Sequence, residues 1–144
     1  MSEFSISSPD FKEGGEIPKK FGYKHGNERP VLTLTPSKEL QAKMKSVAII
    51  MDDPDAMKAV GKVWVHWLTY HSVNDTTKIE GKTDFGEIGY GGPAPPDGKH
   101  TYIFKGYALD TALDLKEGYS KQELEDAMKD HILAEAKLTG TFAP

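Results

Sequence analysis

An apolar run at residues 47–51 is followed at once by acidic residues and a proline, and this change limits the fold more than any other stretch. Apolar side chains at every position suit a central strand that is covered on both faces. Pro54 fixes its own φ and donates no hydrogen bond, so the regular strand should end just before it. We therefore expect Asp53 and Asp55 at the end of a buried strand, where two carboxylates can form the wall of a site.

A second strand is predicted at residues 63–70, which alternate and are rich in β-branched and aromatic side chains. Successive side chains on a strand point to opposite faces. Trp64 and His66 should therefore share one face of this strand, and Trp67 should take the other.

A third strand is predicted at residues 101–109, with His100 and Tyr102 on one face. It is preceded by a turn rich in glycine and proline. Glycines let the backbone approach a ligand closely, and prolines hold a loop in place. The candidate residues of this turn are Tyr90, Gly91, Gly92 and Pro93.

Two interpretations of these polar residues remain open. Taken singly, a histidine on a strand is usually a hydrogen-bonded structural residue, and Asp-Pro-Asp is often only a turn. Taken together, two histidines and two aspartates in a core each need a polar partner, and the nearest partners are one another. Such a cluster, formed around a hole, predicts a pocket.

Further elements are predicted with less effect on the site. Short strands are expected at residues 4–6 and 31–35, and residues 37–45 form either a short surface helix or a long loop. Residues 73–82 are predicted to be an exposed connection. Ser120 and Glu123 fit a capping box that starts a helix, with Gly140 as its stop. Its expected apolar stripe is Leu124, Ala127, Met128, His131, Ile132 and Leu138.

Composition limits the class of protein. A chain of 144 residues can bury the core of one domain, here residues 1–144. A net charge of −4 argues against binding to nucleic acid or to an anionic membrane surface. With no cysteine, disulfides and thiolate chemistry are excluded. Without a signal-like or membrane-length apolar run, no integral membrane association is expected, and a cytoplasmic protein is the default.

Three separated patterns resemble one known family. They are Asp53-Pro54-Asp55-Ala56, Trp64-Val65-His66, and Gly92-Pro93 followed by His100-Thr101-Tyr102. They are similar to the phosphatidylethanolamine-binding proteins, the family of the Raf kinase inhibitor protein, and above all to its short bacterial and archaeal branch. Residues 8–20 and 133–141 extend the resemblance to nearly the whole chain.

The resemblance implies a mainly β fold and a particular pocket. The expected fold is a β-sandwich of antiparallel sheets with one C-terminal α-helix and short peripheral helices. The pocket is expected to be small, open and anion-binding, with no established catalytic activity. Met57 stands where the family usually has proline, and residues 57–63 form a longer loop than in typical bacterial members, so the rim on that side should differ.

The first functional hypothesis is a non-catalytic binding protein. The imidazoles of His66 and His100, expected to be protonated, would surround a phosphate, sulfate or carboxylate together with the Trp64 indole N–H and backbone N–H groups. Tyr102 would add a hydroxyl, and the two aspartates would raise the histidine pKa values and orient the rings. The candidate ligand-binding residues are Asp53, Asp55, Trp64, His66, Tyr90, Gly91, Gly92, Pro93, His100 and Tyr102.

Two further hypotheses belong to other classes. A metal-dependent or other hydrolase could use the Asp/His cluster, but the chain has no His-x-x-x-His, no cysteine pair and no Gly-x-Ser-x-Gly. We therefore expect no tightly bound metal, no cofactor and no catalytic role. An inhibitor of a protein kinase or serine protease is implied by the resemblance, with residues 57–62 as the candidate contact segment. A homodimer is left open by the sequence.

Overall fold

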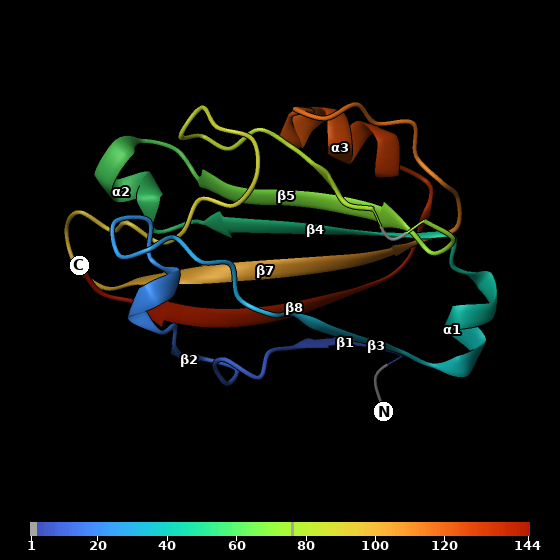
Figure 1. The fold of residues 1–144 in the computed structure, drawn as a ribbon, viewed down its shortest axis with the longest axis horizontal. Helices are drawn as coiled ribbons and strands as arrows, with labels where there is room; N and C mark the ends of the chain where they lie inside the picture. The colour runs from blue at the N-terminus through green and yellow to red at the C-terminus, as the bar shows by residue number, and fades with distance from the viewer. Residues whose placement is uncertain (1–2, 76) are drawn as a thin grey trace.

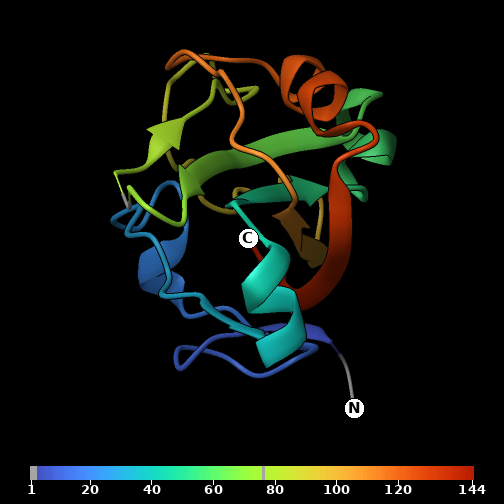
Figure 2. The ribbon, with the colours of Figure 1, turned by 90° about the vertical axis from the view of Figure 1, so that its right-hand side faces the viewer.

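A computed structural model shows two sheets that face each other (Figures 1 and 2). The structure describes residues 3–75 and 77–144. The small sheet pairs β1 (Phe4–Ser7) with β3 (Thr33–Pro36). The six-stranded sheet has the order β2-β8-β7-β4-β5-β6, in which only the β2–β8 pair is parallel. Its strands are β2 (Gly15–Glu16), β4 (Ser46–Asp53), β5 (Trp64–Ser72), β6 (Ile79–Glu80), β7 (His100–Leu109) and β8 (Ile132–Phe142).

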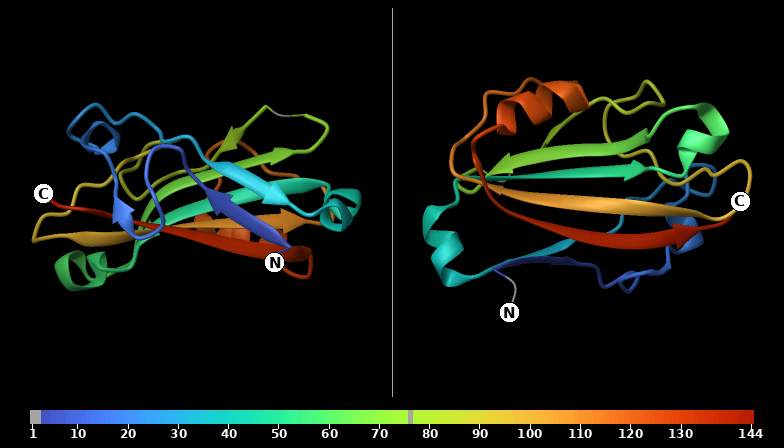
Figure 3. Two further views of the ribbon diagram at one scale, coloured as in Figure 1. Left: turned by 90° about the horizontal axis from the view of Figure 1, so that it is seen from below. Right: turned by 180° about the vertical axis from the view of Figure 1, so that it is seen from behind.

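The described helices are short and lie on the outside of this sandwich. They are η1 (Lys19–Phe21), α1 (Lys38–Lys43), α2 (Ala56–Val60) and α3 (Lys121–Met128). Figure 3 shows α1 at one end of the long strands and α2 at the opposite end, near the C-terminus. The predicted mainly β sandwich is confirmed.

The apolar run predicted as a central strand forms β4, which lies between β5 and β7 and is buried at every residue. Its side chains pack on both faces of the sheet. Met51 packs between the two sheets with Phe104 and Leu138. Ala48 and Ile50 pack on the outer face. Pro54 follows the last residue of the strand, as its missing N–H predicts.

Helix α3 covers the outer face of the six-stranded sheet (Figure 2). Leu124 and Met128 bury its apolar side. The buried Asp52 carboxylate lies 3.1 Å from Nζ of Lys105 and 3.4 Å from Nζ of Lys121. This pairing holds the start of the helix to the sheet and satisfies a charge that would otherwise be buried alone.

The helix that begins at Ser120 is shorter than predicted. The capping box is present, because Ser120 Oγ accepts from the Glu123 N–H and the Glu123 carboxylate accepts from the Ser120 N–H, each at 3.0 Å. The helix nevertheless ends at Met128, and the prediction that it continues to Gly140 is wrong. After a turn with positive φ at Asp130, the chain forms β8, which pairs along β7.

The physical reason is an ambiguous pattern. Leu138, Gly140 and Phe142 are two apart and buried, so the segment has the period of a strand as well as apolar residues at helical spacing. Pairing with β7 decides between them, and that partner is distant in sequence. His131, expected on the helical stripe, instead lies before β8 with its Nδ1 at 2.8 Å from the Asp110 carboxylate.

The remaining expectations differ in detail. Residues 37–45 form the helix rather than the loop, with Ser37 as N-cap of α1. The strand expected at 31–35 begins at Thr33. The connection at 73–82 contains β6, whose Glu80 is buried. In the described part of the chain, no helix is long and apolar enough to cross a membrane.

Gly140 and Gly106 provide a matched test of core packing. A Cβ at Gly140 would lie 2.6 Å from Ile17 Cγ1 and 2.8 Å from Phe11 Cε2, whereas a Cβ at Gly106 would meet nothing closer than 3.5 Å. We expect Gly140→Ala to lower the free energy of unfolding by about 1–3 kcal/mol, the usual effect of overpacking. Gly106→Ala, one strand away, should be neutral or stabilising. Urea denaturation of both variants checks this, and equal losses would contradict it.

Candidate functional site

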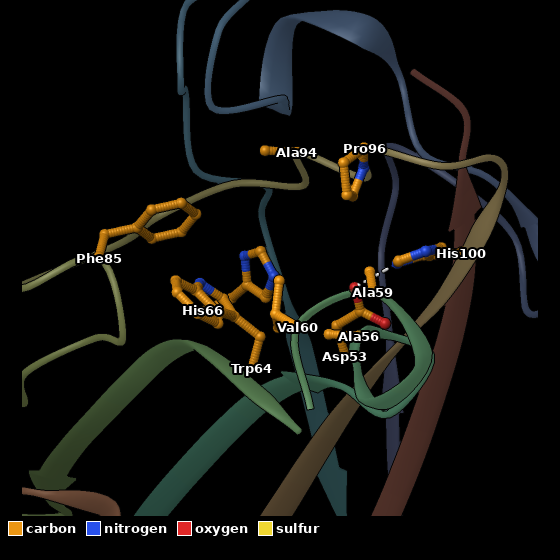
Figure 4. Close-up of a pocket in the computed structure, with 10 residues that line it drawn as sticks. All are labelled: Asp53, Ala56, Ala59, Val60, Trp64, His66, Phe85, Ala94, Pro96 and His100. Atoms are coloured by element: carbon orange, nitrogen blue, oxygen red, sulfur yellow. Dashed lines mark hydrogen bonds and ion pairs between the residues drawn. The ribbon is translucent and has the colours of Figure 1, made fainter. Parts of the chain in front are cut away.

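A pocket of about 120 Å³ lies at the end of the sandwich that carries α2. It is formed where β4 ends, β5 and β7 begin, and α2 and the 85–96 region close over them (Figure 4). Four of the sequence-predicted residues come together here: Asp53, Trp64, His66 and His100. The other lining residues are Ala56, Ala59, Val60, Phe85, Ala94 and Pro96.

Hydrogen bonds hold the Asp-Pro-Asp turn at the end of β4 against the start of β7. Asp53 Oδ1 accepts from the Asp55 N–H at 2.9 Å, and Asp53 Oδ2 lies 2.6 Å from Nδ1 of His100. Asp55 Oδ2 accepts from the Thr101 N–H at 2.8 Å. Asp53 therefore belongs to the pocket, whereas Asp55 lies outside its lining and fixes the backbone beside it.

His100 is held between two carboxylates. Its Nδ1 contacts Asp53, and its Nε2 lies 2.6 Å from Asp97 Oδ1. Both nitrogens can be donors only in the imidazolium form. Burial acts to lower the pKa of His100, but the hydrogen bonds and charges of Asp53 and Asp97 outweigh it and raise the pKa above its ordinary value. His100 is therefore the cation of the site.

Asp97 was not recognised from the sequence. Its side chain is 49% exposed, whereas that of His100 is only 4% exposed. The available signal was an acidic residue three positions before a candidate histidine, within the glycine- and proline-rich turn.

His66 lies in an irregularity of β5. Across the sheet Met51 pairs with Trp67 and Asp52 pairs with Val65, so His66 is the extra residue of a β-bulge. The bulge brings His66 to the inner side, where Trp67 also packs. The expectation that these two residues take opposite faces is therefore wrong.

His66 differs from His100 in charge. Its Nδ1 lies 2.7 Å from the Gly91 carbonyl, which can only accept, so Nδ1 carries the proton. Burial lowers the pKa of His66 and outweighs the neighbouring Asp53. His66 is thus neutral at pH 7, with an unprotonated Nε2, and does not have the charge expected from the sequence.

Gly91 and Gly92 do not present free N–H groups to the pocket. The Gly91 N–H donates to the His66 carbonyl at 2.8 Å, and the Gly92 N–H donates to Asn27 Oδ1 at 2.7 Å. A Cβ on Gly92 would lie 1.9 Å from the Phe21 carbonyl oxygen. Glycine is needed at position 92 because two backbone segments touch there.

Tyr90 and Pro93 also contact the segment at residues 21–23. The Tyr90 hydroxyl donates to the Phe21 carbonyl at 2.9 Å, and the Pro93 carbonyl accepts from the Tyr23 N–H at 2.9 Å. Both residues lie outside the pocket lining. They hold the loop that carries Ala94 and Pro96 over the pocket.

Tyr102 lies behind the imidazoles. It is fully buried, outside the pocket lining, and its ring centroid is 5.1 Å from that of His66 in an edge-on arrangement. Burial, followed by the charge of Asp53, raises the pKa of Tyr102, so its hydroxyl stays protonated.

The walls of the pocket are apolar. Ala56, Ala59 and Val60 line it at helical spacing, so α2 turns one side towards the cavity. Met57, at the position where the resemblance led us to expect proline, is 52% exposed and lies outside the pocket lining. The longer loop therefore forms a short helical rim.

Aromatic rings complete the opposite wall. Phe85, which was not singled out from the sequence, packs edge-on against Trp64 at 5.6 Å between centroids and stacks on Tyr23 at 4.0 Å. The Trp64 indole N–H makes no hydrogen bond with the described residues. It is therefore a free neutral donor at this wall.

Asp53 should matter for folding as well as for the site. Asp53→Ala leaves the Asp55 N–H and the buried His100 Nδ1 without their acceptor, and the buried donor alone costs about 1–3 kcal/mol. We expect a clear fall in melting temperature. Asp126→Ala, which removes one charge from the exposed side of α3, is the matched control and should melt like the wild type. If Asp53→Ala has the melting temperature of the wild type, the structural role of Asp53 is contradicted.

The raised pKa of His100 predicts how stability depends on pH. Its contribution is fully present below the ordinary histidine value of about 6.5 and is lost as pH rises through the raised value. The difference in unfolding free energy between the wild type and His100→Gln should therefore be larger at pH 6 than at pH 9. His66 and the other groups titrate in both proteins, so their contributions to this difference in unfolding free energy largely cancel. A difference that grows towards pH 9 would refute the assignment.

Comparison with known proteins agrees with this fold. A UPF0098 protein of Methanothermobacter thermautotrophicus is 39% identical over 96% of this chain and 97% of its own. The crystal structure of a phosphatidylethanolamine-binding protein homologue from Chlamydia trachomatis gives a TM-score of 0.85 at 34% identity, covering 98% and 97% of the two chains. That of Escherichia coli YbcL, described as a new member of the mammalian family, gives 0.86 at 26% identity and covers 98% of each. The model of the phosphatidylethanolamine-binding protein family matches residues 7–143, and the chain belongs to this family.

Proposed function

We propose that this protein binds a small molecule through an anionic group, phosphate or carboxylate, in the pocket beside α2. One contact carries the proposal. The half-exposed Asp97 places a carboxylate oxygen 2.6 Å from Nε2 of the buried His100, so this imidazolium, which lines the pocket, already holds an anionic oxygen. A charge-assisted contact of this kind is among the strongest hydrogen bonds in proteins.

The size of the pocket supports a head group rather than a whole large ligand. A water molecule takes about 30 Å³ in the liquid, so the cavity of about 120 Å³ has room for roughly four waters. Pockets for drug-sized ligands are usually about 300–1,000 Å³. A phosphate or carboxylate group fits, and the rest of the ligand would lie along the apolar rim.

The site offers two hydrogen-bond donors and one acceptor, and each suits a different part of an anion. His100 supplies the positive charge, and the Trp64 indole N–H supplies a neutral donor. The unprotonated Nε2 of His66 can accept a hydrogen bond from the hydroxyl of a singly protonated phosphate. A phosphomonoester monoanion uses all three groups, whereas sulfate can use only the two donors.

The alternative hypotheses receive no such support. The described lining contains no serine, threonine, cysteine or lysine that could act as a nucleophile. Residues 57–60, within the segment suggested for a protein contact, are helical in α2. The absence of catalysis, the kinase or protease partner, the homodimer and the cytoplasmic location stay predictions.

Sulfate provides a test because it does not titrate between pH 5 and 9. We expect its affinity, measured by calorimetry, to fall as pH rises through the raised pKa of His100, since the imidazolium charge is lost. His100→Ala should abolish binding at pH 6. His131→Ala is the matched control, because His131 also pairs with an aspartate but lies far from the pocket.

Two outcomes would refute the proposal. One is sulfate or methyl phosphate binding that is equal at pH 6 and pH 9. The other is binding that survives His66→Ala combined with His100→Ala.

A further inference from the structure

We infer that Asp97 acts as an internal competitor for the anion site, so that a ligand binds by displacing its carboxylate from His100. This inference rests on the proposed anion-binding function and adds the residue that sets which anions bind well.

Most hydrogen-bond donors of the site already have an acceptor, so few are free to bind an incoming anion. Both nitrogens of His100 are taken by Asp53 and Asp97. The proton of His66 is used on the Gly91 carbonyl. Among the described lining residues, the Trp64 indole N–H remains as a neutral donor, which alone cannot balance an anionic charge. An anion therefore reaches the one cation of the pocket only by replacing a carboxylate.

Asp97 is the carboxylate that can leave. Asp53 is 3% exposed and also accepts from the Asp55 N–H, so moving it would break the turn after β4. Asp97 is half-exposed, and His100 is its only hydrogen-bond or ion-pair partner among the residues described. The next residue, Gly98, has a φ of 151°, and no atom lies within 4 Å of the place of a Cβ. The Asp97 side chain itself is 49% exposed, so it already borders the water into which it would turn.

The exchange has a consequence for selectivity. With His100 charged, the group of His100, Asp53 and Asp97 carries one net negative charge. Replacing Asp97 by a monoanionic group leaves that charge unchanged, so electrostatics alone favours the exchange little. Net affinity must come from other contacts, and the apolar walls at Val60, Trp64 and Phe85 provide them. The expected ligand class is a phosphate monoester or carboxylate with an apolar substituent, in preference to a bare inorganic ion.

The competition is tested by removing Asp97. We expect Asp97→Ala and Asp97→Asn to bind sulfate about tenfold more tightly than the wild type, the size of one hydrogen bond to a charged group. Calorimetry is done at pH 5.5, below the ordinary histidine pKa of about 6.5, and Asp53 remains beside His100 in all the proteins. Asp126→Ala removes the same charge on α3 and should leave the affinity unchanged.

The selectivity is tested in the same titrations. Wild type should bind phenyl phosphate more tightly than methyl phosphate, and Phe85→Ala should reduce this preference. No preference for the phenyl ester would overturn the assigned ligand class.

A spectroscopic readout follows Asp97 itself. The ¹³C resonance of its carboxyl group should move to the position of a solvated aspartate when the wild type is saturated with sulfate. Binding that leaves this resonance unchanged, or Asp97 variants that bind sulfate equally or more weakly, would overturn the competition while the proposed function stands. Absence of binding to the wild type and to both Asp97 variants would refute the inference and the proposed function together. Melting curves of the variants confirm that each is folded.

Discussion

The buried pair between Asp53 and His100 is the interaction on which the site depends. It holds the end of β4 against the start of β7, which is its neighbour in the sheet. The chain between these two strands supplies most of the residues that line the pocket. Charges buried at this depth are tolerated only when they are paired and their remaining hydrogen bonds are made. The second oxygen of Asp53 and the second nitrogen of His100 meet that condition through the Asp55 N–H and Asp97. The same groups that stabilise this end of the sandwich thus hold the imidazolium of the proposed anion site.

Local chemistry made a large part of the fold and the site predictable. The apolar run of β4 and the helix-starting box at Ser120 depend on neighbouring residues only, and both are present. Four residues from three strands, Asp53, Trp64, His66 and His100, line one pocket because strand ends place them on the same side. The resemblance of their motifs to a family agrees with the fold comparison.

The remaining features depend on partners that are distant in sequence. Residues 132–142 satisfy two periods, and only pairing with β7 makes them a strand. The bulge at His66 depends on the register with β4, and the charge of each imidazole depends on what its second nitrogen meets. The N–H groups of Gly91 and Gly92 are free in an isolated loop, but contacts with the folded chain occupy them. Pattern reasoning can find such residues but not their protonation or their partners.

The place of β8 has a consequence for biosynthesis. This last described strand lies between β7 and β2, and its pairing with β2 joins residues 15–16 to residues 140–141. Contacts this far apart form late, because a long loop must close before they stabilise anything. During translation, the edge of β7 that pairs with β8 therefore keeps its N–H and C=O groups unpaired until β8 leaves the ribosome. Exposed edges of this kind recruit other strands. Until β8 pairs with β7, this edge of the nascent chain is exposed to such pairing.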